Sequence, residues 1–171
     1  MTEPIIRVAD IAWGRIKSPD LDVQEEFLTN FGMIKVERTN DKLFMRGTGA
    51  SHHLHVTEKG DPGFISLAFR AASEDDLHKL AKEAESASGV EDIDEPGGGK
   101  RVRLIEPNGY TIEVVHGIEA ADEIPVDRQA YNLGNIDKYK RANELWRRAP
   151  GPATVMRIGH GVIGTPKMHE C

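Results

Sequence analysis

One carboxylate and a group of imidazoles stand where metal chemistry is conceivable. Glu113 lies among β-branched neighbours in the stretch 106–117, EPNGYTIEVVHG. A carboxylate on so apolar a strand is costly unless it is solvated, hydrogen-bonded or bound to a metal ion. His53 and His55, in the stretch 51–56 (SHHLHV), share one face if this stretch is extended, and His52 takes the other. A solvated sheet face and a metal site are both open alternatives at this point.

The turn before Glu113 indicates which element carries it. Pro107-Asn108-Gly109 is strong turn chemistry, because Pro fixes φ while Asn and Gly tolerate positive φ. An apolar strand precedes this turn and another follows, which predicts a hairpin of strands 101–105 and 111–116. Strand alternation then places Glu113 on one face with Thr111 and Val115.

The predicted elements repeat along the chain. The first set is a strand, a helix and three strands, at 5–17, 22–31, 34–38, 42–46 and 53–57. The second set follows the same order, at 64–71, 74–88, 90–93, 101–105 and 111–116. Asp22 and Ser73 are the expected helix caps, and Gly32 and Gly89 the expected stops. The apolar face expected for the first helix is Val23, Phe27, Leu28 and Phe31. The predicted fold class is therefore α+β, with one domain (1–117) made of tandem β-α-β-β-β modules at about 5–58 and 63–117.

A third copy of the pattern begins near the end of the chain. The first strands of the two modules overlay on residues 159–166 (GHGVIGTP), which puts Trp13, Ser66 and His160 in one column. We therefore expect residues 153–171 to hold the first strand of a truncated second domain. Residues 118–152 are polar and contain three prolines and a basic cluster, so they are expected to be an interdomain linker, with a short helix at 136–147.

Composition limits the partners and the compartment. The chain has 28 acidic and 22 basic residues and a net charge of −6, which argues against a nucleic-acid partner. No apolar run approaches the ~20 residues needed to span a membrane, so no membrane association is expected. The one cysteine, Cys171, excludes an internal disulfide framework and suits a cytoplasmic protein. An unpartnered strand at 156–164 would pair with another chain or fold back, and a homo-oligomer is expected.

The tandem modules, the EPNGYTIE hairpin and the IGHGVI stretch at 158–163 resemble the vicinal oxygen chelate superfamily. That superfamily includes glyoxalase I, bleomycin-resistance proteins, methylmalonyl-CoA epimerase and type I extradiol dioxygenases. The pattern is most similar to the N-terminal part of a dihydroxybiphenyl dioxygenase-like extradiol enzyme. The resemblance implies paired modules that form an open half-barrel cleft. It also implies an Fe(II) site of two His and one carboxylate in the full-length protein, acting on a small aromatic diol and O₂.

The resemblance also implies roles for particular residues. His160 matches the first His of the iron triad, whose other two ligands would lie beyond Cys171. The inward positions of the first domain would be Trp13, Ser66, His55 and Glu113, with His53 lining the same cleft. Only two of those four are metal ligands, whereas zinc and iron sites generally need three. We therefore expect His55 and Glu113 to be vestigial positions facing one cleft, and no metal to be bound by this chain alone.

Three functions follow as expectations. The first is the N-terminal domain fragment of an extradiol ring-cleavage dioxygenase, an oxidoreductase of aromatic catabolism, with the fragment itself inactive. The second is a metal-free small-molecule binding protein of the bleomycin-resistance type, which needs an aromatic-lined cleft and no metal. The third is a metal-dependent isomerase like glyoxalase I, which needs three or four His, Glu or Gln ligands.

Overall fold

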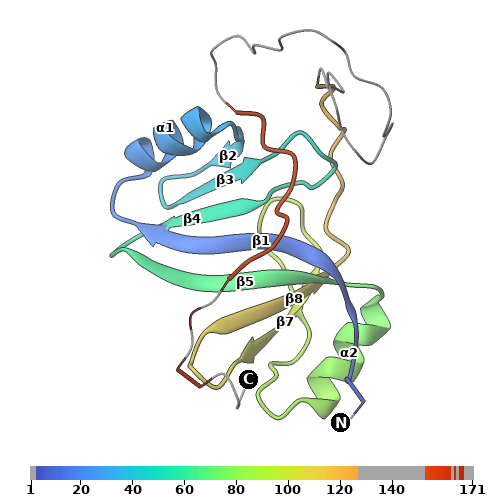
Figure 1. The fold of residues 1–171 in the computed structure, drawn as a ribbon. Coiled ribbons are helices and arrows are strands. Elements are labelled where there is room, and N and C mark those ends of the chain that lie inside the picture. Colours follow the sequence, from blue (N-terminus) through green and yellow to red (C-terminus); the bar gives the residue numbers. More distant parts are fainter. Residues whose placement is uncertain (1–2, 127–152, 163, 165, 168–171) are drawn as a thin grey trace, which may run out of the picture.

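Two runs of secondary structure follow each other in the computed structural model, which describes residues 3–126, 153–162, 164, 166 and 167 (Figure 1). The first run is β1 (Val8–Ser18), α1 (Leu21–Phe31), β2 (Ile34–Arg38), β3 (Lys42–Arg46) and β4 (His55–Lys59). The second run is β5 (Gly63–Ala71), α2 (Glu74–Glu83), β6 (Glu91–Asp92), β7 (Lys100–Ile105) and β8 (Thr111–His116). Both runs have the order β-α-β-β-β, which confirms the predicted repeat and the α+β class.

The strands form a single mixed sheet, in the order β2-β3-β4-β1-β5-β8-β7-β6. The two modules meet at the middle of the sheet, where β1 and β5 pair antiparallel. Within each module the first strand runs parallel to the last, β1 beside β4 and β5 beside β8. The sheet stays open over the described residues, since its outer strands β2 and β6 do not pair with each other. This arrangement is the predicted open half-barrel.

The N-cap of the first helix lies two residues before the expected one. Asp20 is the N-cap, because its carboxylate accepts hydrogen bonds from the backbone N–H groups of Asp22 and Val23. Gly32 ends the helix with φ 103°, as predicted. The expected apolar face is largely wrong: Leu21 and Leu28 are buried, whereas Val23, Phe27 and Phe31 are each more than half exposed. The buried side of the helix therefore carries Leu21 and Leu28, and of the expected face only Leu28 belongs to it.

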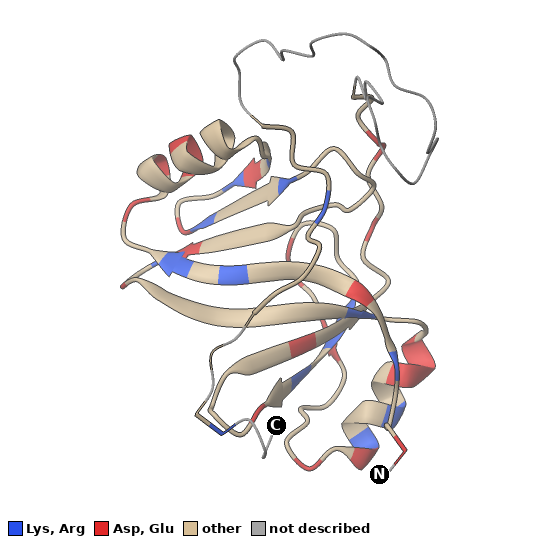
Figure 2. Ribbon diagram, in the orientation of Figure 1, with Lys and Arg blue, Asp and Glu red and all other residues tan. Residues whose placement is uncertain are grey.

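The second helix and the hairpin follow the sequence signals more closely. Ser73 and Asp76 form a capping box, and the first turn of α2 is acidic (Figure 2). The helix ends at Glu83, before the expected stop at Gly89. In the turn between β7 and β8, the carboxylate of Glu106 accepts hydrogen bonds from the backbone N–H groups of Asn108 and Tyr110. The predicted hairpin is therefore confirmed.

The two faces of the sheet carry different cores. Both helices pack on one face, here called the helix face, where α1 meets Leu43 and Met45 and α2 meets Val102 and Val114. The opposite face, here called the inner face, carries a separate cluster, whose buried members are Ala12, Trp13, Phe44, Val56, Ala68, Ile93 and Val115. Strand pairing links these positions, because Phe44 pairs with Val56 within the first module and Trp13 pairs with Ala68 across the two modules. The inner face is where a site between the two modules has to lie.

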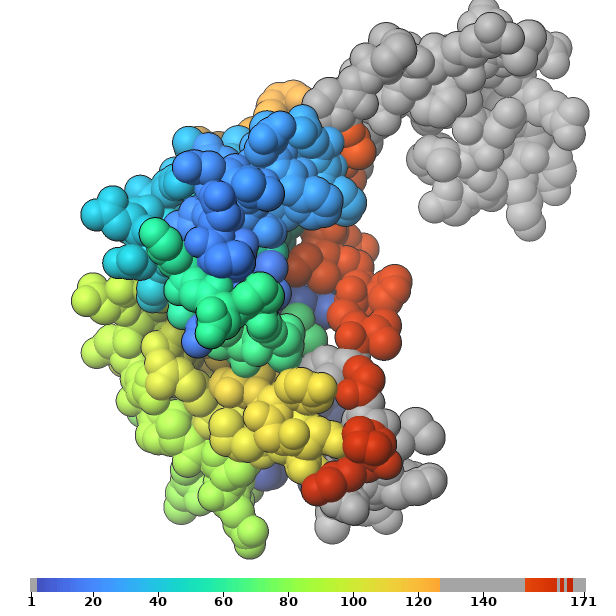
Figure 3. Space-filling model, turned by 90° about the vertical axis from the view of Figure 1, so that its left-hand side faces the viewer, coloured from blue at the N-terminus to red at the C-terminus, as the bar shows by residue number. Residues whose placement is uncertain are grey.

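Residues 153–162 fold back onto the first module (Figure 3). The N–H of Val155 donates to Gly32, and the carbonyls of Val155 and Met156 accept from Thr48 and Gly49. Val155 and Ile158 pack against the α1 core. The strand expected at 156–164 does not form over residues 156–162. Of the two expected outcomes, pairing with another chain or folding back, the structure shows folding back.

The predicted linker is structured at its start. The N–H of Ala121 donates to Ala50 and that of Ile124 donates to Thr48, which holds residues 120–124 on the first module. The basic cluster and the helix expected at 136–147 lie outside the described residues. None of the described helices has the length and apolar character needed to cross a membrane.

Candidate functional site

Glu113 is buried in the inner face and held by three side chains. Its side chain is 3% exposed. The hydroxyl of Ser66 donates to Oε1, and Arg101 Nη1 lies 3.3 Å from Oε2. Arg15 Nε lies 3.6 Å from Oε1. The carboxylate is therefore hydrogen-bonded and charge-balanced, and the alternative of a solvated sheet face is wrong.

Arg15 is the centre of this region, and the sequence analysis missed it. Its side chain is 4% exposed. Nη1 donates to Glu58 at 2.8 Å, and the Nη1 and Nη2 groups donate to Glu95 at 3.1 and 2.6 Å. Burial alone would lower the pKa of Arg15, but hydrogen bonds and the charges of Glu95 and Glu113 raise it above its ordinary value. One guanidinium thus serves three carboxylates, from β4, β8 and the loop before β7.

Two further cations complete what we call the inner-face ion cluster, which consists of Arg15, Lys42, Glu58, Glu95, Arg101 and Glu113. Lys42 donates to Glu95 from β3, and Arg101 approaches Glu113 from β7. Burial would raise the pKa of Glu95, but hydrogen bonds from Arg15 and Lys42 outweigh it and lower the pKa to about 2. Glu95 is therefore charged at neutral pH and is a poor general base, since an effective base titrates near the working pH.

Trp13 and His53 fill the inner face beside the ion cluster. The indole is 1% exposed and the imidazole 3%, and their ring centroids lie 4.5 Å apart. Burial, with a smaller effect of His52, lowers the pKa of His53 to about 3, so the ring is neutral at pH 7. Trp13 Nε1 and His53 Nε2 have no hydrogen-bond partner within the described chain. Trp13, His53 and Ser66 therefore lie on the inner face, where they are buried side chains of the core.

His55 lies on the other side of the sheet. It pairs directly with Met45, which packs against α1 on the helix face, and its Nε2 is 2.7 Å from the hydroxyl of Thr57. Burial lowers the pKa of His55 to about 4. Glu113 pairs with Ala68, which belongs to the inner-face core. The expectation that His55 and Glu113 face one cleft is therefore wrong.

The cause is a difference of one residue between the two modules. In the overlay of the first strands Trp13 shares a column with Ser66, which makes Gly14 and Leu67 equivalent positions, and these two also pair with each other. Gly14 pairs with His55 in the first module, and Leu67 pairs with Ile112 in the second. His55 is thus the counterpart of Ile112, and not of Glu113. A shift of one residue turns a strand side chain to the opposite face.

The donor set does not fit a metal ion in this domain. Glu58, Glu95 and Glu113 are all engaged by guanidinium or ammonium groups, and the bulk of Trp13 adjoins them. His160 is exposed, in the irregular segment 153–162. Within the described ranges, no three His, Cys, Asp or Glu side chains are grouped in a way that could hold a metal.

Comparisons with known proteins place this geometry in context. No protein-family model matches the chain. Over 126 residues it is 27% identical to the manganese-dependent 2,3-dihydroxybiphenyl 1,2-dioxygenase of Geobacillus genomosp. 3, covering 70% of this chain and 39% of that protein. The Mn(II)-bound glyoxalase from Novosphingobium aromaticivorans superposes with a TM-score of 0.66 at 23% identity, over 71% of this chain and 43% of the other. Homoprotocatechuate 2,3-dioxygenase from Brevibacterium fuscum gives 0.62 at 19%, over 70% and 40%.

The chain has the vicinal oxygen chelate fold. The likeness to glyoxalase and extradiol dioxygenase structures confirms the resemblance given by the tandem modules and the EPNGYTIE hairpin. This chain spans about two fifths of the length of these relatives. Two of the relatives are manganese proteins by name, whereas iron was expected from the sequence.

Proposed function

We propose that this chain is the metal-free first domain of an extradiol ring-cleavage dioxygenase, which opens a small catechol-type diol with O₂ and a non-haem divalent metal. The sequence relative named as a dihydroxybiphenyl dioxygenase and the fold both support this proposal. In it, the metal is held outside the first domain, and residues 1–171 alone are inactive.

The observation that carries the proposal is the position of Arg15. Its guanidinium lies between Glu58, Glu95 and Glu113 at the junction of the two modules. A divalent cation there would have to displace a buried charge that already satisfies these carboxylates. This arrangement supports a structural or partner-binding role for the inner face. Ring cleavage is then carried out by residues outside the first domain.

The identity of the metal remains a prediction. Fe(II) is expected from the extradiol resemblance, and the two manganese relatives make Mn(II) an equal candidate. Both ions favour imidazole and carboxylate ligands with positions left open for substrate. His160 is proposed as one such ligand in a longer protein, since it sits in the third copy of the first-strand pattern.

The test uses the purified chain of 171 residues. After anaerobic incubation with Fe(II) or Mn(II) and desalting, we expect well below one metal ion per chain. Addition of 2,3-dihydroxybiphenyl in air should then give no yellow ring-fission product. A stoichiometric ion that is lost on Glu113→Gln and kept on His160→Ala would contradict the proposal, because it would place a metal site on the inner face.

The isomerase alternative fits the described residues less well. An isomerase of the glyoxalase type needs three or four ligands on one face, and His55 lies on the opposite face from Glu113. Homo-oligomer formation remains a proposal as well, and light scattering of the same sample measures it directly.

A further inference from the structure

A cavity of about 390 Å³ lies apart from the inner-face ion cluster. Its walls come from the start of β1, the end of β5, the loop 49–51, residues 118–123 and the segment 153–162. Both modules and the folded-back segment thus contribute to it. Its volume falls within the range of about 300–1,000 Å³ typical of small-molecule sites.

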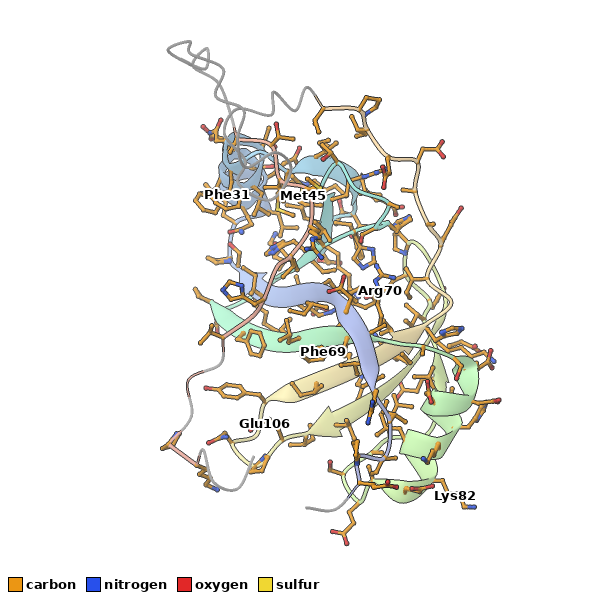
Figure 4. The ribbon with its side chains drawn as sticks, turned by 45° about the vertical axis from the view of Figure 1, so that its right-hand side comes forward. Phe31, Met45, Phe69, Arg70, Lys82 and Glu106 are labelled. Atoms are coloured by element: carbon orange, nitrogen blue, oxygen red, sulfur yellow. The ribbon has the colours of Figure 1, made fainter. Side chains whose placement is uncertain are left out.

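Arg70 is the distinctive group in this cavity (Figure 4). It is half-buried at the end of β5, and its Nη2 donates to the hydroxyl of Ser51 at 3.3 Å. No carboxylate of the described residues lies within ion-pair distance of it. A guanidinium carries five N–H donors and stays charged at any physiological pH. Most of the donors of Arg70 are therefore available to a ligand.

The other arginines that are at least half-buried show how unusual this is. Arg15, Arg101 and Arg103 each pair with one or more glutamates. Arg46 has no carboxylate either, but its donors reach three backbone carbonyls. Within the described part of the chain, only Arg70 keeps a half-buried charge without such acceptors. A half-buried guanidinium with one hydroxyl as its acceptor can take an anion as an additional partner.

The remaining lining defines which anion fits. Arg157 adds a second guanidinium, whose Nη1 lies 4.0 Å from Asp10 Oδ2. Glu119 and Glu123 also line the cavity, and all four of these side chains are exposed. Two guanidiniums against three carboxylates disfavour a dianion such as phosphate. Ile118 and Met156 supply apolar wall. A planar carboxylate can accept two parallel hydrogen bonds from one guanidinium.

We propose that this cavity binds a small organic monocarboxylate. The carboxylate pairs with Arg70, next to the hydroxyl of Ser51, and the apolar body of the ligand lies against Ile118 and Met156. Because Met156 belongs to the folded-back segment, the bound ligand also holds residues 153–162 on the first module. The site is independent of ring cleavage and of any metal.

Benzoate is the probe, with inorganic phosphate as the dianion for comparison. Isothermal titration of the full chain should show benzoate binding and markedly weaker phosphate binding. Arg70→Gln should weaken benzoate binding about tenfold or more, since it removes a charge-assisted pair. The matched control is Arg7→Gln, which removes the same charge from an exposed position outside the cavity and should change the affinity less than about twofold.

Circular dichroism establishes whether Arg70→Gln is folded. If it is not, Ala50→Phe replaces it, because Ala50 is an exposed lining residue whose enlargement blocks the cavity without touching a charge. Wild-type chain that binds no benzoate at about 10 mM overturns the proposal. So does equal binding by the Arg70→Gln or Ala50→Phe variant, or phosphate binding tighter than benzoate binding.

Discussion

Arg15→Met is the sharpest test of the ion cluster at the centre of the inner face. Methionine keeps an unbranched apolar stem of similar length and removes the guanidinium that joins Glu58, Glu95 and Glu113. Arg15 and Glu58 belong to the first module, and the other two carboxylates to the second. The substitution therefore cuts the ionic contact between the modules and leaves buried carboxylates short of a cation.

The expected loss follows from which cations remain. Removing one partner of a buried ion pair typically costs about 3–5 kcal/mol. Lys42 still reaches Glu95 and Arg101 still reaches Glu113, so the lower end, about 3 kcal/mol, applies here. A domain with about 5–15 kcal/mol of total stability remains folded after such a loss. At a urea m-value of about 2 kcal/mol/M, the midpoint should fall by about 1.5 M.

Urea unfolding followed by circular dichroism measures this change. The control is Arg103→Met, because Arg103 is 42% exposed and its one carboxylate partner among the described residues is the partly exposed Glu91, which predicts a loss below about 1 kcal/mol. Arg15→Lys should fall between the two, since one ammonium cannot serve three carboxylates. A loss under about 1 kcal/mol for Arg15→Met would refute the reasoning, and would mean that the cluster is no more than a set of compensating charges.

Two further predictions concern acid stability and the folded-back segment. The pKa of Glu95 is about 2 in the folded chain, below the ordinary value of 4.5, so its stabilising effect is lost as the pH falls from 4.5 towards 2. Glu95→Gln should flatten the acid dependence of the urea midpoint in that window, and an unchanged slope would contradict this. Gly47→Ala should release residues 153–162 to proteolysis, because an added Cβ would lie 2.5 Å from the carbonyl oxygen of Met156, whereas Gly14→Ala meets no atom within 4 Å and should not.

Local signals account for what the sequence predicted well. The turn at Pro107-Asn108-Gly109 and the Ser73 capping box depend on residues within four positions of one another, so their chemistry can be read directly. The β-α-β-β-β order of each module follows from local signals of this kind, which occur in both halves of residues 5–117. The cap of α1 was misplaced because Asp20 and Asp22 are both good caps, and only the packing of Leu21 chooses between them.

The candidate site is formed by contacts between residues far apart in the sequence, which local sequence patterns do not predict. Arg15 bonds to Glu58 and Glu95, which are 43 and 80 positions away. Overlaying the modules gave the right column for Trp13 and Ser66 on the first strands. It failed on the last strands, where a shift of one residue separates His55 from Glu113. Register between strands far apart in sequence is set by packing, and a short motif such as SHHLHV does not reveal it.

The cations around Glu113 show how a buried carboxylate at this position of the fold can have a structural role. A carboxylate on the last strand of a module, buried like Glu113, needs a positive charge nearby. In this chain the charge comes from the protein itself, through Arg15 of the neighbouring module and Arg101 of the next strand. A metal ion bound at such a position would be exchangeable and could present open sites to a substrate, whereas a guanidinium on a strand is permanent and has none. The same carboxylate therefore links the two modules here, and the three carboxylates of the inner-face ion cluster are all paired with cations of the chain itself.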